Sequence, residues 1–175
     1  LPIVLPLLVG AGLLLSRATS PTLRRTVSLV AQALMVAIAI ALVVQAGDGT
    51  IRYYALGDWQ PPFGIVLVLD RLSATMVLLS SLLGLLACLY ATAGIDETGS
   101  NFHGLFLLQL MGINGAFLTG DLFNLFVFFE VLLIASYGLA LHGRGPARVK
   151  GGIHYVVLNL IGSALFLVAL GLAYG

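Results

Sequence analysis

The segment Leu122–Leu141 reads LFNLFVFFEVLLIASYGLAL, and its composition decides the fold class of this chain. Glu130 is its single charged residue, and most of the other residues are large and apolar. About 20 apolar residues are needed for a helix to cross about 30 Å of hydrocarbon. The segment is therefore predicted to be a transmembrane helix.

Five more stretches of the chain have the same apolar character. They are Leu1–Leu15, Thr26–Gln45, Arg71–Thr92, Phe102–Leu118 and Val149–Tyr174, the first and the fourth being the shortest. Hydrophobic residues make up 60% of the 175 residues and charged residues 9%, whereas soluble domains carry about a quarter charged residues. We expect an all-α integral membrane protein with six transmembrane helices, in which residues 1–175 form a single transmembrane domain.

The two ends of the chain are also apolar. No basic region precedes the first stretch and no small-residue cleavage site follows it, so a membrane span is expected there in place of a signal peptide. Because the first and last spans coincide with the chain ends, we expect both ends to continue in a longer protein.

The segment 47–69 differs from the spans. Thr50–Tyr54 is β-branched and aromatic, Gly57-Asp58 and Pro61-Pro62 indicate turns, and Ile65–Leu69 is a short apolar run. This pattern predicts a small β-hairpin outside the membrane, between the second and third spans. The alternative is that Ile65–Leu69 forms the first turn of a longer helix. Asp70 is placed to cap the third span.

The basic residues indicate the orientation of the chain. The connections after the first, third and fifth spans hold six of them, Arg17, Arg24, Arg25, Arg144, Arg148 and Lys150, against Arg52 and Arg71 on the other side. Cytoplasmic loops are enriched in Lys and Arg. The N-terminus and the hairpin are therefore expected to face outward, from a bacterial cell membrane.

Glu130 is the residue most indicative of function. It lies eight residues into its span, about 12 Å along the helix, and a carboxylate at that depth costs about 2.5–3.5 kcal/mol on insertion scales. Glu130 must be neutral, paired or hydrated, and acids at mid-depth usually mark ion paths. The alternative is a Glu that packs against a polar neighbour without a transport role. We expect Glu130 to act as an intramembrane proton carrier.

Other polar residues in the last two spans are weaker candidates for a hydrated path. Tyr137 lies on the same helical face as Glu130. Asn159 belongs to a polar and small stripe with Tyr155 and Ser163, which fits helix packing as well as water lining. His154 lies one turn inside its span, where an interfacial hydrogen-bonding role competes with a proton relay.

Small residues elsewhere in the spans, such as Gly112, Gly115, Gly138 and Gly162, are expected to allow close helix packing. The sequence offers no soluble type of active site. The three His residues, at 103, 142 and 154, lack metal-ligand spacing, Cys88 is the single cysteine, and no phosphate-binding Gly-Lys-Ser/Thr loop occurs. We expect no metal, no cofactor and no nucleic-acid partner, and any driving force must come from an ion gradient or a partner subunit.

Three segments resemble a known family. Thr119–Tyr137 resembles the fifth-helix motif of the D subunit of the Mrp-type multisubunit sodium/proton antiporters, which is similar to the proton-pumping membrane subunits of respiratory complex I. Gly152–Leu167 resembles the sixth helix of that family and Tyr54–Asp70 its outward-facing hairpin.

The resemblance implies a function. In that family the fifth-helix glutamate, matched here by Glu130, pairs with a lysine on the seventh helix, and the pair controls proton movement. The counter-charge is thus expected beyond residue 175, because this sequence covers only the first helices. The implied partners are other membrane subunits, the lipid bilayer, protons and monovalent cations such as sodium. Two alternatives stay open: a proton-pumping subunit of complex I or a membrane-bound hydrogenase, and a non-conducting structural subunit.

Overall fold

The structure is a computed structural model of the chain, and it describes residues 1–16, 20–59, 64–99, 101–143 and 145–174. Arg17 and Arg144, which entered the orientation prediction, lie outside the described residues, as does the tip of the predicted hairpin with Pro61 and Pro62. The helices of the described part are α1 (Val4–Leu15), α2 (Pro21–Ala46), α3 (Arg71–Ala91), α4 (Phe102–Leu118), α5 (Leu122–Ala140) and α6 (Pro146–Tyr174).

These six helices confirm the all-α membrane fold predicted from the sequence. Helices α2, α3, α5 and α6 are each long and apolar enough to cross a membrane. Helix α1 has 12 residues and α4 has 17, so at 1.5 Å per residue α1 extends about 18 Å and α4 about 26 Å. The two shortest helices thus correspond to the two spans that were predicted to be shortest.

The start of α2 differs from the prediction. The sequence predicts that the second span begins at Thr26, with Arg24 and Arg25 in the connection before it, but α2 begins at Pro21 and includes both arginines. The Ser20 hydroxyl accepts a hydrogen bond from the Leu23 amide at 3.3 Å, and Pro at the first helical position lacks only an amide that has no partner there. This capping signal, Ser followed by Pro, extends the helix beyond its apolar part.

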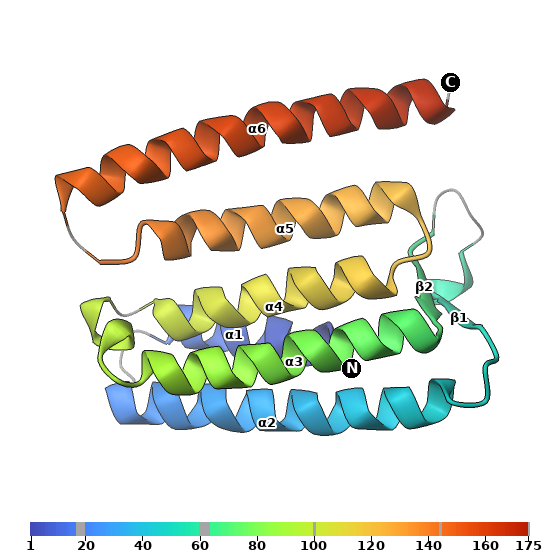
Figure 1. Cartoon of the computed structure of the whole chain (residues 1–175), viewed down its shortest axis with the longest axis horizontal. Coiled ribbons are helices and arrows are strands. Elements are labelled where there is room, and N and C mark those ends of the chain that lie inside the picture. Colours follow the sequence, from blue (N-terminus) through green and yellow to red (C-terminus); the bar gives the residue numbers. More distant parts are fainter. Residues whose placement is uncertain (17–19, 60–63, 100, 144, 175) are drawn as a thin grey trace.

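The helices lie side by side with their axes roughly parallel or antiparallel (Figure 1). Helices α1–α4 pack together around buried residues such as Met35, Val77 and Leu107. Helix α5 packs on α4, and α6 packs chiefly on α5, at the outer side of the layer.

Close contact between α4 and α5 depends on glycine, as the sequence predicted. A Cβ atom at Gly112 would lie 2.8 Å from the backbone nitrogen of Leu132 and 2.9 Å from the carbonyl oxygen of Phe128. At Gly115 it would lie 2.2 Å from the ring of Phe128. Both glycines therefore let the α5 backbone approach α4. Gly162 on α6 does not follow the expectation, because a Cβ there would meet nothing within 4 Å.

The predicted hairpin is present. Strands β1 (Arg52–Ala55) and β2 (Val66–Leu69) pair antiparallel, with Arg52 opposite Leu69 and Ala55 opposite Val66. The first strand begins two residues later than predicted, and a short 3₁₀ turn, η1 (Leu56–Asp58), follows it. An isolated two-stranded hairpin is marginal in water, and here the same chain supports it. The Gly120 amide donates to the Val66 carbonyl at 2.8 Å, and Leu67 and Leu69 pack against the cluster around Val77.

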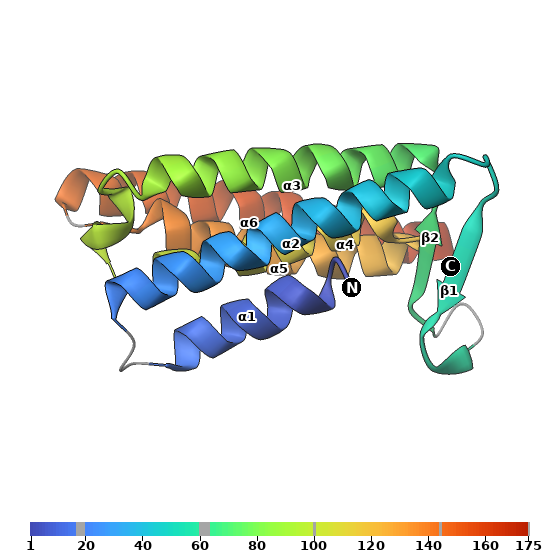
Figure 2. The same ribbon diagram turned by 90° about the horizontal axis from the view of Figure 1, so that it is seen from below.

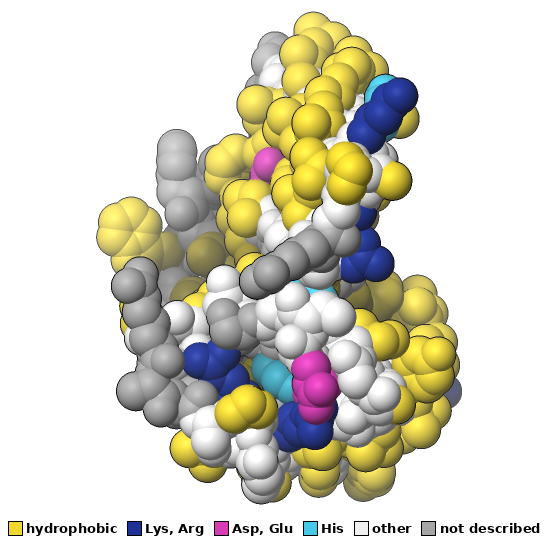
Figure 3. Space-filling view, turned by 90° about the vertical axis from the view of Figure 1, so that its left-hand side faces the viewer, with side chains coloured by type: hydrophobic (Ala, Val, Ile, Leu, Met, Phe, Trp, Pro, Cys, Tyr) yellow, Lys and Arg dark blue, Asp and Glu magenta, His cyan; other side chains and the backbone are white. Residues whose placement is uncertain are grey.

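The hairpin and the α4–α5 connection lie at one end of the helices, and the starts of α2 and α6 lie at the opposite end (Figure 2). We call them the hairpin end, which also carries Arg52 and Arg71, and the basic end, where α2 and α6 begin and the 3₁₀ turn η2 (Ile95–Thr98) joins α3 to α4. Figure 3 views the basic end, where Lys, Arg, His and acidic side chains gather. Among the described residues, Arg24, Arg25, Arg148 and Lys150 belong to this end.

Candidate functional site in the membrane span

Glu130 lies near the middle of α5. Helix α5 begins after Asp121, whose side chain accepts a hydrogen bond from the Asn124 amide at 2.8 Å. Glu130 is the ninth of its 19 residues, so about 12 Å of helix separates it from the first turn and about 15 Å from the last. The Asp121 cap sets the start of α5, and the position of Glu130 along the helix then places its carboxylate near the middle of α5.

The side chain of Glu130 points into a groove between α5 and α6. The groove has a volume of about 270 Å³. Its lining is largely apolar, and Phe126 stacks on Phe166 with ring centroids 6.0 Å apart. The polar groups in the lining are Glu130, Asn159 and Ser163, and the Ser163 hydroxyl donates a hydrogen bond to Oε1 of Glu130.

Glu130 has no counter-charge within the described part of the chain. The ion pairs found there join Arg25, Asp96, Glu97 and His103, or Arg52 and Asp48, all at the helix ends. A half-buried carboxylate at mid-span is therefore held by a hydroxyl, in a groove with room for water or another side chain.

The other residues predicted for a hydrated path lie at different distances from Glu130. Asn159 lines the same groove, although its amide donates to the Tyr155 carbonyl at 2.8 Å. Tyr137 lies two turns further along α5 and contacts Tyr155 edge to face, with centroids 5.7 Å apart. His154 is exposed near the start of α6, where its Nδ1 lies 2.9 Å from the Lys150 carbonyl. The structure thus brings Glu130, Asn159 and Ser163 together and leaves His154 apart.

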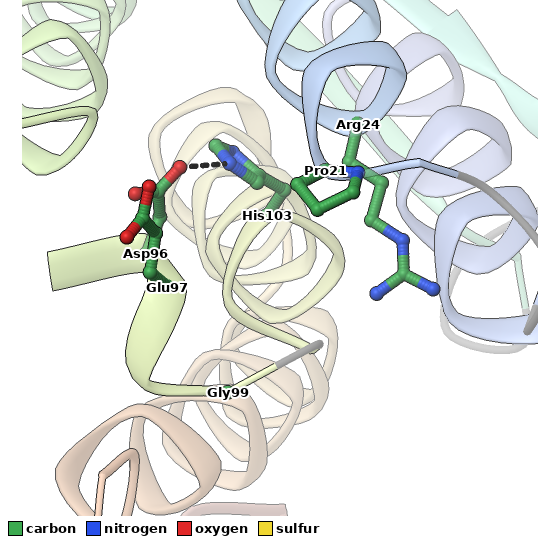
Figure 4. A pocket seen from close by; sticks show the side chains of 6 residues that line it. All are labelled: Pro21, Arg24, Asp96, Glu97, Gly99 and His103. Atoms are coloured by element: carbon green, nitrogen blue, oxygen red, sulfur yellow. Dashed lines mark hydrogen bonds and ion pairs between the residues drawn. The ribbon is translucent and has the colours of Figure 1, made fainter. Parts of the chain in front are cut away.

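A second polar cluster, which the sequence did not reveal, lies at the basic end. Arg25 donates from Nε to Oδ2 of Asp96 at 2.6 Å and from Nη2 to Oδ1 at 2.8 Å, and Nη2 also reaches Glu97 at 2.9 Å. His103 Nε2 lies 3.0 Å from Asp96 Oδ2. Figure 4 shows Asp96 on η2 and His103 on α4 meeting beside Pro21 and Arg24.

This cluster borders a pocket of about 390 Å³. The Asp96 side chain is only 3% exposed, and its hydrogen bonds from the Arg25 guanidinium hold the pKa of the carboxyl below its usual range. One feature of the sequence is consistent with this pair, although it does not predict the contact. Arg24-Arg25 begins α2 and Asp96-Glu97 follows α3, and antiparallel neighbours bring these positions to one end.

Within the described ranges, no group of three or more His, Cys, Asp and Glu side chains is placed to hold a metal ion. The groove at Glu130 offers one carboxylate, one amide and one hydroxyl. Of these three groups, the carboxylate is the acidic one.

Comparison with known proteins agrees with this geometry. Residues 119–175, which include α5 and α6, match the family described as NADH:quinone oxidoreductase/Mrp antiporter, TM. The whole chain is 51% identical to the D subunit of a "Probable K(+)/H(+) antiporter" from Rhizobium meliloti, over 33% of that protein. It is 43% identical to the D subunit of a "Na(+)/H(+) antiporter" from Alkalihalophilus pseudofirmus, with 99% of this chain and 35% of that protein covered.

The fold also matches part of one subunit in a solved complex. A chain in the structure of the Mrp complex from a Dietzia species superposes with a TM-score of 0.93 and 35% identity, covering 99% of this chain and 33% of that one. Over nearly its whole length the chain is therefore similar to the N-terminal third of the antiporter D subunits, and it spans about a third of the length of these relatives.

Proposed function

We propose that this chain is part of an ion-translocating membrane subunit of a multisubunit monovalent cation/proton antiporter, in which Glu130 carries the proton. The observation that carries the proposal is the carboxylate of Glu130 at mid-span, in a groove where its partner is the Ser163 hydroxyl. The relatives named as K(+)/H(+) and Na(+)/H(+) antiporter subunits support it. On this proposal the chain is a transporter subunit and not an enzyme.

The chemistry of Glu130 follows from its surroundings. Apolar walls disfavour the charged carboxylate, whereas a hydroxyl donor and a nearby cation favour it. A cation that approaches and leaves would thus make the carboxylate release and take up a proton. One elementary charge moved through 100 mV is worth about 2.3 kcal/mol, which is comparable to modest changes in such a pair. We expect the cation on a helix outside residues 1–175.

The decisive experiment changes Glu130 in the full-length protein within its complex. Glu130→Gln keeps the shape and removes the titrating proton, so antiport should be lost while the complex still assembles. Glu130→Asp keeps the acid with a shorter reach and should retain part of the activity. Cation-dependent pH change in everted vesicles measures both. Wild-type activity of the Gln variant in an assembled complex would show that Glu130 is only packed against Ser163.

A second candidate is a proton-translocating subunit of a respiratory complex such as complex I or a membrane-bound hydrogenase, because the matched family includes NADH:quinone oxidoreductase subunits. The two candidates differ in what drives the proton. An antiporter acidifies or alkalinises vesicles when Na⁺ or K⁺ is added, whereas a respiratory subunit does so only when its redox partner turns over. A non-conducting structural subunit would tolerate Glu130→Gln in either assay.

The proposal also covers the location and orientation of the protein. We place it in a bacterial cytoplasmic membrane, with further membrane subunits as partners and with the basic end in the cytoplasm. The bias of Lys and Arg toward that end supports the orientation. The N-terminus and the hairpin would then face outward.

A further inference from the structure

The core formed by α2, α3 and α4 contains a buried amide whose hydrogen bonds are unfilled. Gln32 on α2 is fully buried. Its side chain lies beside the Cys88 thiol, but neither Oε1 nor Nε2 makes a well-aligned hydrogen bond to a described residue. Buried polar groups in native proteins are nearly always satisfied, by protein or by ordered water. This amide lies in another part of the protein from the Glu130 groove, which is built by α5 and α6.

A line of polar side chains joins Gln32 to the pocket at the basic end. Ser28 lies one turn before Gln32 on the same face of α2, and its Oγ is 3.6 Å from the Cys88 sulfur on α3. Cys88 in turn lies 3.8 Å from Nδ1 of His103. All of these side chains are buried, and His103 also lines the pocket beside Asp96.

The proton positions along this line follow from Asp96. Arg25 keeps Asp96 ionised, and an ionised carboxylate only accepts hydrogen bonds. His103 Nε2 must therefore donate to Asp96, so that Nδ1 of the neutral imidazole is an acceptor facing the Cys88 thiol. With Cys88 donating to His103, the Cys88 sulfur can accept a hydrogen bond from the Ser28 hydroxyl.

We propose that Gln32, Ser28 and Cys88 form a buried water-binding site, which His103 closes off from the pocket at the basic end. The four polar atoms of these side chains supply the two to four partners that an internal water needs. This site is separate from the groove at Glu130.

The first test is an experimental map of the full-length protein in its complex, at a resolution that shows ordered water elsewhere in the interior. A peak is expected within hydrogen-bond distance of the Gln32 amide, and it should vanish in Gln32→Leu. A wild-type map without a peak beside Gln32 would overturn the proposal.

The melting temperature of Gln32→Leu provides a second test of the proposed water site. If water satisfies the amide, Gln32→Leu removes paired groups and should lower the melting temperature or leave it unchanged. If the amide is unsatisfied, the same change removes a buried unpaired group and should raise the melting temperature. Met35→Leu, at an equally buried apolar position one turn away on α2, controls for the change of shape. A rise specific to Gln32→Leu would contradict the water site.

The role of His103 is tested through Cys88. In a full-length protein whose other cysteines are replaced, a small aqueous methanethiosulfonate reagent should modify Cys88 slowly. In His103→Ala the opening from the pocket should speed the modification severalfold. Ala39→Cys, at a buried position in the apolar cluster with Val77, should stay slow in both backgrounds. Equal rates for Cys88 with and without His103 would show that His103 does not close the site.

Discussion

The Ser163 hydroxyl on α6 donates a hydrogen bond to the carboxylate of Glu130 on α5. It is one of two polar contacts between these helices in the described residues, the other joining Ser136 to the Tyr155 hydroxyl at 3.1 Å. The first contact lies at mid-span and the second nearer the basic end. Replacing each serine in turn can therefore distinguish a role in ion transfer from a role in helix packing.

Replacing Ser163 by Ala should slow antiport without preventing assembly. The Glu130 carboxylate loses the hydroxyl that holds its orientation and supports its charged form, and a hydrogen bond to a charged group is worth about 1.5–3 kcal/mol. A loss of that size corresponds to about a tenfold or greater drop in rate if the contact acts in the transfer step. The measurement is the cation-dependent pH change in everted vesicles.

Ser136→Ala is the matched control for this prediction. It removes the same atom from the same helix interface, at a position outside the lining of the Glu130 groove. Its antiport rate should stay close to wild type. Equal losses in the two variants would mean that Ser163 matters only because it joins α5 to α6.

Replacing Gly112 by Ala should destabilise the contact between α4 and α5. The new methyl group would lie 2.8 Å from the Leu132 nitrogen and 2.9 Å from the Phe128 carbonyl, and backbone atoms cannot move aside as a flexible side chain can. Overpacking of this kind costs about 1–3 kcal/mol. Thermal unfolding of the purified protein in detergent should show a lower midpoint.

Gly151→Ala on α6 provides the comparison, since a Cβ there would meet nothing within 4 Å. Alanine is favoured over glycine in a helix interior by about 1 kcal/mol, so this variant should be as stable as the wild type or more so. If Gly112→Ala were equally harmless, the two helices would be free to separate slightly, and the close packing would not contribute to stability.

The elements predicted correctly are those whose information is local. Apolar length predicted the helices, and the aromatic and β-branched run predicted β1. Asp70 caps α3 as expected, with its carboxylate accepting from the Ser73 amide at 2.7 Å. The same local bonds hold the pKa of Asp70 below its usual range. Helix α2 begins earlier than its apolar pattern predicts, because Ser20 and Pro21 form a capping pattern that lies before the apolar residues.

Contacts between helices were harder to predict, because they depend on how far one helix slides along another. The sequence placed Glu130 at half-depth and Ser163 on a polar stripe of α6, but it could not show that the two side chains meet. The sequence does not predict the contacts of Asp96 and His103 for a related reason. Asp96 belongs to a connection and looks solvated in the sequence, whereas Arg25 and the start of α4 enclose it in the fold.

The orientation of the protein can be tested by labelling single cysteines in intact cells. Ile51→Cys lies beside the hairpin and is exposed, and Thr22→Cys is exposed in the first turn of α2 without disturbing the Ser20 cap. A membrane-impermeant maleimide should label position 51, and it should label position 22 only after the cells are opened. Labelling of position 22 in intact cells would reverse the orientation.

Arg25→Gln should destabilise the protein at neutral pH, because the Asp96 side chain is only 3% exposed and would lose its charged partner, although Arg25 itself is 28% exposed. The change leaves the Asp96 carboxylate facing His103 without the guanidinium that neutralises it. Thermal unfolding of wild type and variant, each followed from neutral to acidic pH, measures the difference.

The pH dependence of that difference has a definite sign. The Arg25 guanidinium lowers the pKa of Asp96 in the folded protein relative to the unfolded chain, where an Asp titrates near about 3.9. A lowered folded pKa contributes stability that is present above the unfolded pKa and is lost as the pH falls through the folded pKa. The gap between wild type and Arg25→Gln should thus be complete at pH 7 and close below about pH 4. Arg25→Lys keeps the charge but loses the two-point contact with Asp96, so it should fall between the two. A gap that stayed constant down to low pH would show that Arg25 stabilises the start of α2 by packing and not through Asp96.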